Sequence, residues 1–185
     1  MHPRDHAPRR LTALAAALLL AACGSPGTET PNGQPAPDTA AGDWTSGVVH
    51  RASAGGGIAT LTRVRAATQD GHDRIVFEFP GSGLPGYRIE YIDRPVRQCG
   101  SGEAVQIAGD GWLQIRMEPA QAHDEQGRPT ITERAFSPGL PTIREARLTC
   151  DFEGQVTWVL GVASPNPYRV LELAAPPRLV VDVRH

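Results

Sequence analysis

The chain has 185 residues and contains no lysine, because all eighteen of its basic residues are arginines. This absence excludes a Schiff-base lysine, a phosphate-loop lysine and a Ser-Lys dyad. We attribute it to a coding bias toward GC-rich codons. The formal net charge is −2, and a nucleic-acid partner would favour a basic chain or patch. We therefore expect no nucleic-acid partner.

Catalytic and metal-binding motifs are also scarce. Residues 58–185 contain His72, His123 and His185 as their only histidines, with no H-E-x-x-H, calcium loop or G-x-S-x-G elbow. Ser137, His123 and Asp124 fall in one long segment, but a shared segment does not establish a triad geometry. We predict no catalytic residue, no metal site and no cofactor, and we keep a cryptic hydrolase as a minor alternative.

The stretch 81–86 matches G-x-G-x-x-G by its letters. A dinucleotide site needs a helix N-terminus after the glycines to hold the pyrophosphate. Pro85 and a β-type run follow instead, so we interpret the stretch as a turn between strands.

Only one long apolar run is present, Leu11 to Ala22, and it follows Arg4, Arg9 and Arg10. A charged start, a short apolar stretch and a small-residue exit are typical of a secretory signal peptide. At about 18 Å as a helix, the run is too short to span a bilayer. The exit Leu-Ala-Ala-Cys-Gly resembles the bacterial lipobox, so residues 1–22 are predicted to be removed and Cys23 to be lipidated.

Two or three acyl chains on Cys23 would anchor the protein durably, since each buried CH₂ contributes about 0.8 kcal/mol. The alternative is a non-lipidated signal peptide with a chance cysteine. The lipobox implies an extracytoplasmic protein bound to the cell membrane, or to the outer membrane where the organism has two.

The remaining cysteines, Cys99 and Cys150, form an even pair in a compartment that is then oxidising. We predict a disulfide that closes a loop of about 50 residues and contributes on the order of 4 kcal/mol in the chain-entropy model. A metal site or a reactive thiol is the alternative, but two cysteines without neighbouring histidines make a poor zinc site.

Residues 23–57 are rich in Gly, Pro, Ser, Thr and Ala. Such a composition buries too little apolar surface to offset the entropy lost on ordering. We predict a disordered, lipidated tether with an rms span of roughly 30–35 Å. Trp44 is its unusual residue, and it either docks on the domain or membrane or stays exposed.

From residue 58 onward, short apolar or alternating runs are separated by Gly, Pro and Asp. This pattern predicts an all-β domain over 58–185, a β-sandwich or barrel. The segment 119–141 is too rich in proline for a helix, and we expect either an exposed functional loop or an ordered arm across the sandwich. The predicted strands are 58–66, 74–80, 87–93, 104–108, 112–118, 143–152, 155–162, 168–173 and 178–184.

Two parts of the domain resemble each other at an offset of 81 residues. Tyr87-Arg88-Ile89 matches Tyr168-Arg169-Val170, and Phe77, Phe79, Pro95 and Arg97 have counterparts in Trp158, Leu160, Pro176 and Arg178. A duplication explains this echo, and so does the general likeness of short strands with proline turns. Two similar halves would suit a sandwich of two similar antiparallel sheets.

The closing stretch, from Tyr168 through Pro-Arg178 to Asp182, resembles the final strands of AMIN domains, and 73–79 resembles their early strand. The region 58–185 is most similar to the AMIN-like domain of bacterial envelope lipoproteins. The resemblance implies a β-sandwich in the cell envelope and a role in binding peptidoglycan or in localising amidases and secretins. The sequence departs from those family members in showing no amidase or secretin domain, so we do not expect a targeting role.

The candidate ligand-binding residues are aromatic and arginine side chains, because flat rings suit sugar faces and arginine suits carboxylates. The alternative is that the rings fill the edges of the sandwich. Asp182, in a β-branched run, faces solvent or, if buried, needs Arg88 or Arg169 as its partner. We prefer a structural role for it. The candidates are Trp112, Arg116, Tyr87, Arg88, Tyr168 and Arg169.

These observations favour a lipid-anchored, non-enzymatic module that binds peptidoglycan or another component of the cell envelope. An assembly or inhibitory partner of an envelope enzyme is the alternative. A hydrophobic patch around 119–141 would favour that partner, whereas a groove lined with rings would favour glycan binding.

Overall fold

The structure is a computed structural model that describes residues 42–81 and 83–185. The predicted signal peptide, Cys23 and residues 24–41 of the predicted tether lie outside the described residues. Within the described part, no helix is long and apolar enough to cross a membrane.

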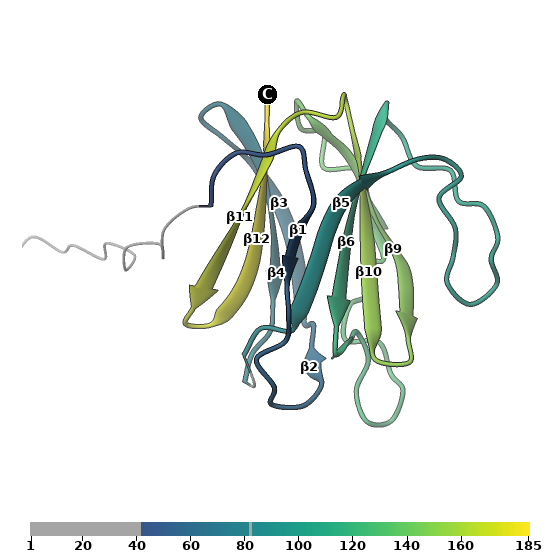
Figure 1. The fold of residues 1–185 in the computed structure, drawn as a ribbon. Coiled ribbons are helices and arrows are strands. Elements are labelled where there is room, and N and C mark those ends of the chain that lie inside the picture. Colours follow the sequence, from purple (N-terminus) through teal and green to yellow (C-terminus); the bar gives the residue numbers. More distant parts are fainter. Residues whose placement is uncertain (1–41, 82) are drawn as a thin grey trace, which may run out of the picture. The chain divides into compact units, whose positions relative to one another are not determined.

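Twelve strands and no helix make up the described residues, which confirms the all-β prediction (Figure 1). Every strand pair is antiparallel except β2 with β7. The strands are β1 (Val49–Arg51), β2 (Ala59–Thr60), β3 (Arg63–Gln69), β4 (His72–Glu78), β5 (Gly86–Ile92), β6 (Gly111–Glu118), β7 (Ala120–Gln121), β8 (Ala135–Phe136), β9 (Ile143–Phe152), β10 (Gln155–Val162), β11 (Tyr168–Ala174) and β12 (Pro177–Arg184).

The strands form two main sheets that pack face to face as a β-sandwich (Figure 1). One sheet has the order β1-β5-β6-β10-β9-β8, the other the order β11-β12-β4-β3. Side chains alternate between the core and the outside along each strand. In β6, for example, Leu113, Ile115 and Met117 are fully buried, while Arg116 between them is exposed.

Each half of the domain contributes one hairpin to each sheet. The first half gives β3–β4 to the four-stranded sheet and β5–β6 to the six-stranded sheet, and the second half gives β11–β12 and β9–β10 to the same two sheets. The halves meet at the centre of each sheet, where β4 pairs with β12 and β6 pairs with β10. The matching Tyr-Arg pairs of the sequence echo lie on β5 and β11. These strands begin the equivalent hairpins β5–β6 and β11–β12, which belong to different sheets.

The core lies between the two sheets. Trp158 of β10 is fully buried there, with its ring centroid 6.1 Å from that of Phe77 and 6.1 Å from that of Phe136. Burying an aromatic ring of this size removes 150–250 Å² from water, so about 4 kcal/mol is at stake for such a residue. The matching positions Phe77 and Trp158 of the two halves therefore meet at the centre of the fold.

Two strand predictions need correction. The predicted strand 58–66 divides into β2 and β3, which pair with different partners. The predicted strand 104–108 is not a strand and forms only an isolated bridge between Arg97 and Ala104. Its apolar residues pack instead on the outside of the six-stranded sheet, where Ile107 and Val96 cover Val159. A short apolar run therefore marked a covering loop rather than a strand.

The disulfide between Cys99 and Cys150 is present, as predicted, with a Cα–Cα distance of 5.2 Å. It attaches the β5–β6 loop to β9. On the same loop, the backbone of Ala108 approaches Gly161 so closely that a Cβ at that position would overlap the Ala108 carbonyl oxygen. The loop is thus held against the sheet at two points.

The tether prediction extends too far along the chain. Residues 42–57, which we assigned to it, include β1, which pairs with β5. Just before β1, Thr45 and Tyr168 exchange two backbone hydrogen bonds of 2.8 Å each. This segment first runs beside β11, the edge strand of the four-stranded sheet. It then pairs as β1 with β5 and forms the edge of the six-stranded sheet. Its small residues misled the composition argument, because backbone pairing needs no apolar side chains.

The segment 119–141 is an ordered arm rather than a free loop. Its first residues form β7, which pairs with β2, and β8 pairs with β9. Between these strands, Ile131 is buried and the Thr130 hydroxyl donates a 2.6 Å hydrogen bond to the Leu61 carbonyl. Of the two possibilities for this segment, the structure supports the arm.

Candidate ligand-binding site

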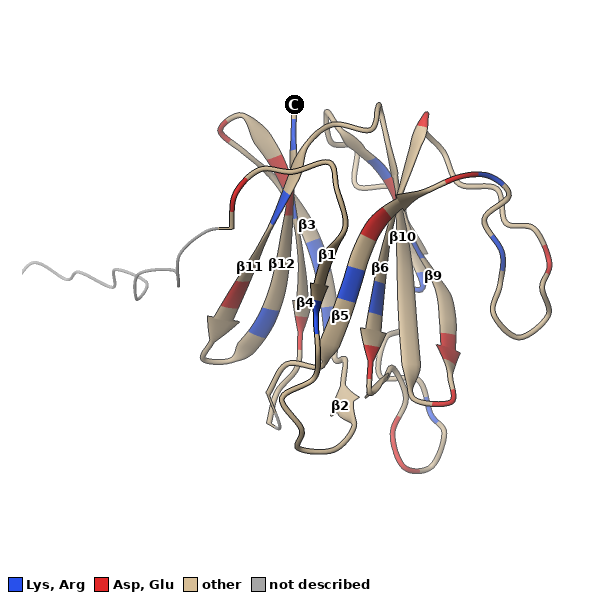
Figure 2. Cartoon of the chain, in the orientation of Figure 1, with Lys and Arg blue, Asp and Glu red and all other residues tan. Residues whose placement is uncertain are grey.

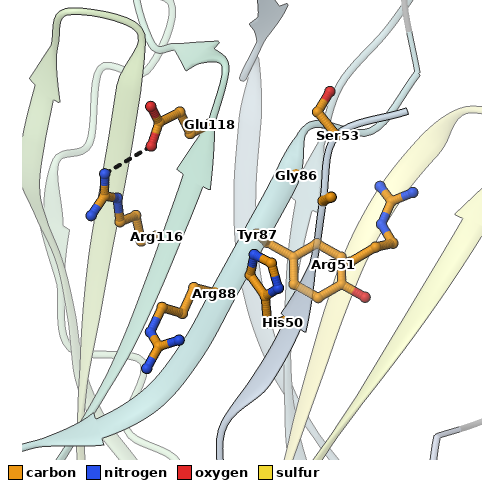
Figure 3. A pocket seen from close by; sticks show the side chains of 9 residues that line it. His50, Arg51, Ser53, Gly86, Tyr87, Arg88, Arg116 and Glu118 are labelled. Atoms are coloured by element: carbon orange, nitrogen blue, oxygen red, sulfur yellow. Dashed lines mark hydrogen bonds and ion pairs between the residues drawn. The ribbon is translucent and has the colours of Figure 1, made fainter. Parts of the chain in front are cut away.

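A hollow of about 290 Å³ lies on the outer face of the six-stranded sheet, over β1, β5 and β6 (Figure 3). Gly86 lines its floor, where a Cβ would lie 2.6 Å from the Ser53 nitrogen and 2.9 Å from the Glu118 carbonyl oxygen. A glycine is therefore required for the backbones to approach here. The hollow is lined by His50, Arg51, Ala52, Ser53, Gly86, Tyr87, Arg88, Arg116 and Glu118.

A row of basic side chains crosses this hollow. In the strand register, His50 of β1 lies opposite Arg88 of β5, and Arg88 lies opposite Arg116 of β6. Side chains directly opposite each other on one face have Cβ atoms about 5 Å apart, and like charges in that arrangement destabilise a sheet. Figure 3 shows Arg88 and Arg116 on the same side of the sheet. The strand register thus places two like charges opposite each other.

The other half of the domain shows what a stabilising pair looks like at the same place. Arg169 of β11 corresponds to Arg88, and its partner in the register is Asp182 of β12. There the arginine Nε donates to the carboxylate over 2.9 Å. The equivalent position on β6 holds Arg116 instead of an aspartate. The contrast between two equivalent pairs within one chain points to a function for the arginines of the hollow.

Each arginine of the pair is partly neutralised by a glutamate on its own strand. Arg88 forms hydrogen bonds of 2.6 and 2.8 Å with Glu90, and Arg116 donates a 2.8 Å bond to Glu118. The hydrogen bonds from Arg88 lower the pKa of the Glu90 carboxyl. Figure 2 shows the resulting succession of acidic and basic segments along β5 and β6. All four side chains remain at the surface, where an anionic ligand can displace the glutamates.

Arg51 and Tyr87 close the hollow on its other side. The Arg51 Nε lies 2.7 Å from the Glu172 carboxylate, and the Tyr87 hydroxyl donates a 2.8 Å hydrogen bond to the same oxygen. Burial, followed by the bond to Glu172, raises the pKa of Tyr87. Its ring is 8% exposed and lies beneath the Arg51 guanidinium at 5.3 Å. Tyr87 therefore shapes the wall of the hollow and offers little ring surface to a ligand.

The remaining candidates do not join this site. Trp112 lies on the same sheet, but the Arg94 guanidinium covers its ring at 4.2 Å and its indole N–H donates to the Ile107 carbonyl. Tyr168 is fully buried and its hydroxyl lies within hydrogen-bonding distance of the carbonyls of Gly47 and Ile89, to which its one hydrogen can be donated, so its ring is not available at the surface. Burial raises the pKa of Tyr168 to about 12. For Tyr87 and Tyr168 the structure supports the alternative that rings fill the sandwich.

Arg169 lies on the opposite sheet, in a buried ion-pair cluster. Asp182 is fully buried there and accepts hydrogen bonds from Arg74 over 2.7 and 3.0 Å and from Arg169 over 2.9 Å. His72 Nε2 lies 3.2 Å from the same carboxylate. Burial opposes ionisation, but the two arginines outweigh it and lower the pKa of Asp182. The prediction that a buried Asp182 needs an arginine partner is therefore confirmed, and the partner is Arg169, together with Arg74.

His72, His123 and His185 each lie beside a carboxylate. His123 Nδ1 lies 2.9 Å from Asp151, and His185 Nε2 lies 3.0 Å from Asp73. Of the residues Ser137, His123 and Asp124, the histidine binds Asp151 and the aspartate binds Arg128 within its own turn. In the part of the chain that is described, no group of three or more His, Cys, Asp or Glu has the arrangement of a metal site.

A hydrophobic patch around residues 119–141 or a groove lined with exposed rings would distinguish the functional alternatives. The described residues show neither feature in full. The large hydrophobic side chains that are exposed among the described residues, Val48, Ile58 and Phe152, do not belong to the arm itself, although Ile58 precedes β2, which pairs with β7 of the arm. The hollow, for its part, is lined by arginines rather than by exposed rings. The chemistry that it offers is recognition of anions, above all carboxylates, by paired guanidinium groups.

Sequence reasoning missed His50 and Ser53, which lie in the segment assigned to the tether. The run Val48-Val49-His50-Arg51 was the available signal for a strand here, but four residues are too few for a periodicity argument. It also missed the pairing of Arg88 with Arg116, because register is a property of the folded sheet.

Comparison with known protein families finds that the model of the AMIN-like domain matches residues 59–185. No curated protein and no solved structure matches the chain. The match begins with β2 and covers all the remaining strands of both sheets.

Proposed function

Because this chain belongs to the AMIN-like domain family, we propose that it is a non-enzymatic module that binds peptidoglycan from a lipid anchor on Cys23. AMIN domains are associated with peptidoglycan binding, and the family match covers β5 and β6 of the hollow but not its β1 side. The disulfide is consistent with a location outside the cytoplasm. Lipidation of Cys23 would place the sandwich within reach of the wall.

The observation that carries the proposal is the opposition of Arg88 and Arg116. The stem peptides of peptidoglycan end in carboxylates, and a carboxylate between two guanidinium groups would relieve their repulsion. Charge-assisted hydrogen bonds of this kind are stronger than neutral ones, and arginine binds carboxylates in a bidentate manner. Ser53 and His50 lie at the edge of the same hollow and add polar groups for the sugar or the peptide backbone.

Under this proposal, a substitution in the hollow should weaken peptidoglycan binding without lowering the free energy of unfolding. Arg116→Thr should weaken binding to purified peptidoglycan sacculi about tenfold, as expected for the loss of one charged hydrogen-bonding partner. It should not lower the free energy of unfolding, because it removes a like-charge contact and introduces a good strand former. The protein to test is the chain from residue 23 onward with Cys23→Ala, assayed by co-sedimentation and urea unfolding.

Arg144→Thr is the matched control, since Arg144 is an exposed strand arginine of β9 outside the hollow. It should bind sacculi as the parent protein does. Equal binding of the Arg116 and Arg144 variants would remove the hollow from the proposal, and no binding of the parent protein would remove peptidoglycan as the ligand.

The anchor needs a separate test in cells. Palmitate should label the full chain, and Cys23→Ala should abolish the label because the thiol of the predicted lipobox, which accepts the diacylglycerol, is lost. Unchanged labelling of that variant would contradict lipidation at Cys23.

A further inference from the structure

The outer face of the four-stranded sheet is strongly basic. Alternation along β3, β4, β11 and β12 places six arginines on this face against two carboxylates, those of Glu78 and Asp182. Figure 2 shows basic segments on β12 as part of this face. The chain as a whole is slightly acidic, with a formal charge of −2, so positive charge is concentrated here. The arginines are Arg63, Arg65, Arg74, Arg169, Arg178 and Arg184.

The same face is unusually apolar between the arginines. Val76, Leu171 and Val180 form a small cluster that is buried although it lies outside the sandwich core, and Leu173 packs against it. A shallow hollow of about 200 Å³ has Val76 and Val180 on its floor. Its rim includes Arg65, Arg74 and Arg178. Long arginine side chains can cover apolar surface with their stems while their charged ends remain in water.

One end of this face also carries Trp44. The Trp44 ring lies under the guanidinium groups of Arg169 and Arg184, at 4.7 and 4.5 Å from their central carbons. Two residues earlier, the Gly42 amide donates to the Val170 carbonyl of β11. The chain therefore reaches the domain from its N-terminal side at the edge of the basic sheet, beside a tryptophan.

We propose that this face of the domain rests directly on an anionic phospholipid surface. Guanidinium groups bind phosphate in a bidentate manner, and each basic residue close to an anionic membrane contributes about 1 kcal/mol. Acidic residues on the other faces do not cancel this attraction, because salt screens charges beyond roughly 8–10 Å. Trp44 is half-buried beneath Arg169 and Arg184, so it marks this face for spectroscopy rather than offering a free ring to the membrane.

This orientation goes beyond the proposed function and is compatible with it. The two outer faces of a sandwich point in opposite directions, so a domain that lies on its four-stranded sheet turns the six-stranded sheet away from the membrane. The hollow with Arg88 and Arg116 would then face the wall.

Vesicle co-sedimentation tests the proposal without peptidoglycan, so its failure and that of the proposed function are distinguishable. The chain from residue 23 onward with Cys23→Ala should bind vesicles of phosphatidylcholine and phosphatidylglycerol, and not vesicles of phosphatidylcholine alone. Added salt should weaken this binding. Arg63→Gln with Arg178→Gln should lower the affinity about 25-fold, since each lost arginine corresponds to about fivefold. Neither arginine contacts the Asp182 cluster.

The matched control is Arg97→Gln with Arg144→Gln, which changes the net charge equally at exposed sites outside the basic sheet. It should keep the affinity of the parent protein. An equal loss in both double variants would show that only total charge matters and would overturn the proposal. Absence of any preference for phosphatidylglycerol would overturn the proposal as well. That outcome would include the case in which the basic face binds a second copy of the protein instead of a membrane.

A second measurement identifies the face in contact. Brominated phosphatidylglycerol should quench tryptophan fluorescence in the Trp112→Phe variant, which retains Trp44, and much less in Trp44→Phe. Trp112 belongs to β6 of the other sheet. Stronger quenching in Trp44→Phe than in Trp112→Phe would place the other sheet on the membrane and contradict the orientation.

Discussion

At the scale of single residues, the ion-pair cluster around Asp182 is the costliest feature to disturb. Asp182→Asn would leave Arg74 and Arg169 near a neutral amide in a site from which water is largely excluded. Removing one partner of a buried ion pair costs about 3–5 kcal/mol, and we expect that loss in the free energy of unfolding measured with urea. Asp93→Asn, at an exposed position, should change it by less than about 0.5 kcal/mol. A similarly small effect at Asp182 would contradict the role given to the cluster.

The buried carboxylates of Asp182 and Asp73 contribute to the way in which the stability of the protein responds to acid. Burial raises the pKa of Asp73, but bonds from His185 and from the amides of Ile143 and Thr142 outweigh it, so its folded pKa, like that of Asp182, is lowered. The unfolded chain, with an ordinary aspartate pKa of about 3.9, then binds more protons than the folded chain. Their contribution to stability is therefore complete above about pH 4 and is lost as the pH falls through the folded pKa values.

Urea unfolding at a series of acidic pH values measures this loss. Asp182→Asn should flatten the dependence of stability on pH below about 4, because one of the two groups no longer titrates. A variant that keeps the full acid dependence of the parent protein would show that other groups cause it.

Residue chemistry could be predicted from the sequence only in part. Arg88 and Arg116 were chosen because arginine suits carboxylates, and both line the hollow. Tyr168 was chosen on the same kind of argument, yet it is fully buried. Residue type indicates which ligand a side chain can bind, whereas exposure depends on the pleat, and the alternation around Tyr168 did not determine which way it faces.

At the scale of elements, the β5–β6 loop is the feature that the sequence disguised most. Its apolar residues Val96 and Ile107 resemble those of a strand, but they cover Val159 from outside the sheet. A long, alternating strand such as β6 is predicted correctly, because one buried face imposes a period of two. Short strands that depend on backbone pairing, such as β1, carry no such period.

Gly161→Ala tests how this loop is held. The new Cβ would overlap the Ala108 carbonyl oxygen, so the loop must shift at a cost of about 1–3 kcal/mol, as for overpacked interiors. Hydrogen exchange should become faster in the β5–β6 loop while the core strands remain protected. Gly100→Ala, in the same loop but with open space around it, should change neither quantity. Unchanged exchange in the Gly161 variant would show that the loop is not seated as described.

At the scale of the whole molecule, the two halves share a topology but carry different residue pairs at equivalent strand positions. Equivalent strand positions hold the pair of Arg169 with Asp182 in one sheet and the pair of Arg88 with Arg116 in the other. The echo in the sequence predicted the first relation, two similar halves. It could not predict the second, because Arg116 and Asp182 lie outside the aligned stretch and match only through the hairpin register.

The most direct test of the binding site is a nuclear magnetic resonance titration of the ¹⁵N-labelled chain from residue 23, with Cys23→Ala, using soluble disaccharide-peptide fragments of peptidoglycan. The account predicts that amide shifts concentrate in β1, β5 and β6 around His50, Arg88 and Arg116, and that Arg116→Thr suppresses them. Shifts centred on the four-stranded sheet, or none at fragment concentrations that saturate known binders, would contradict it.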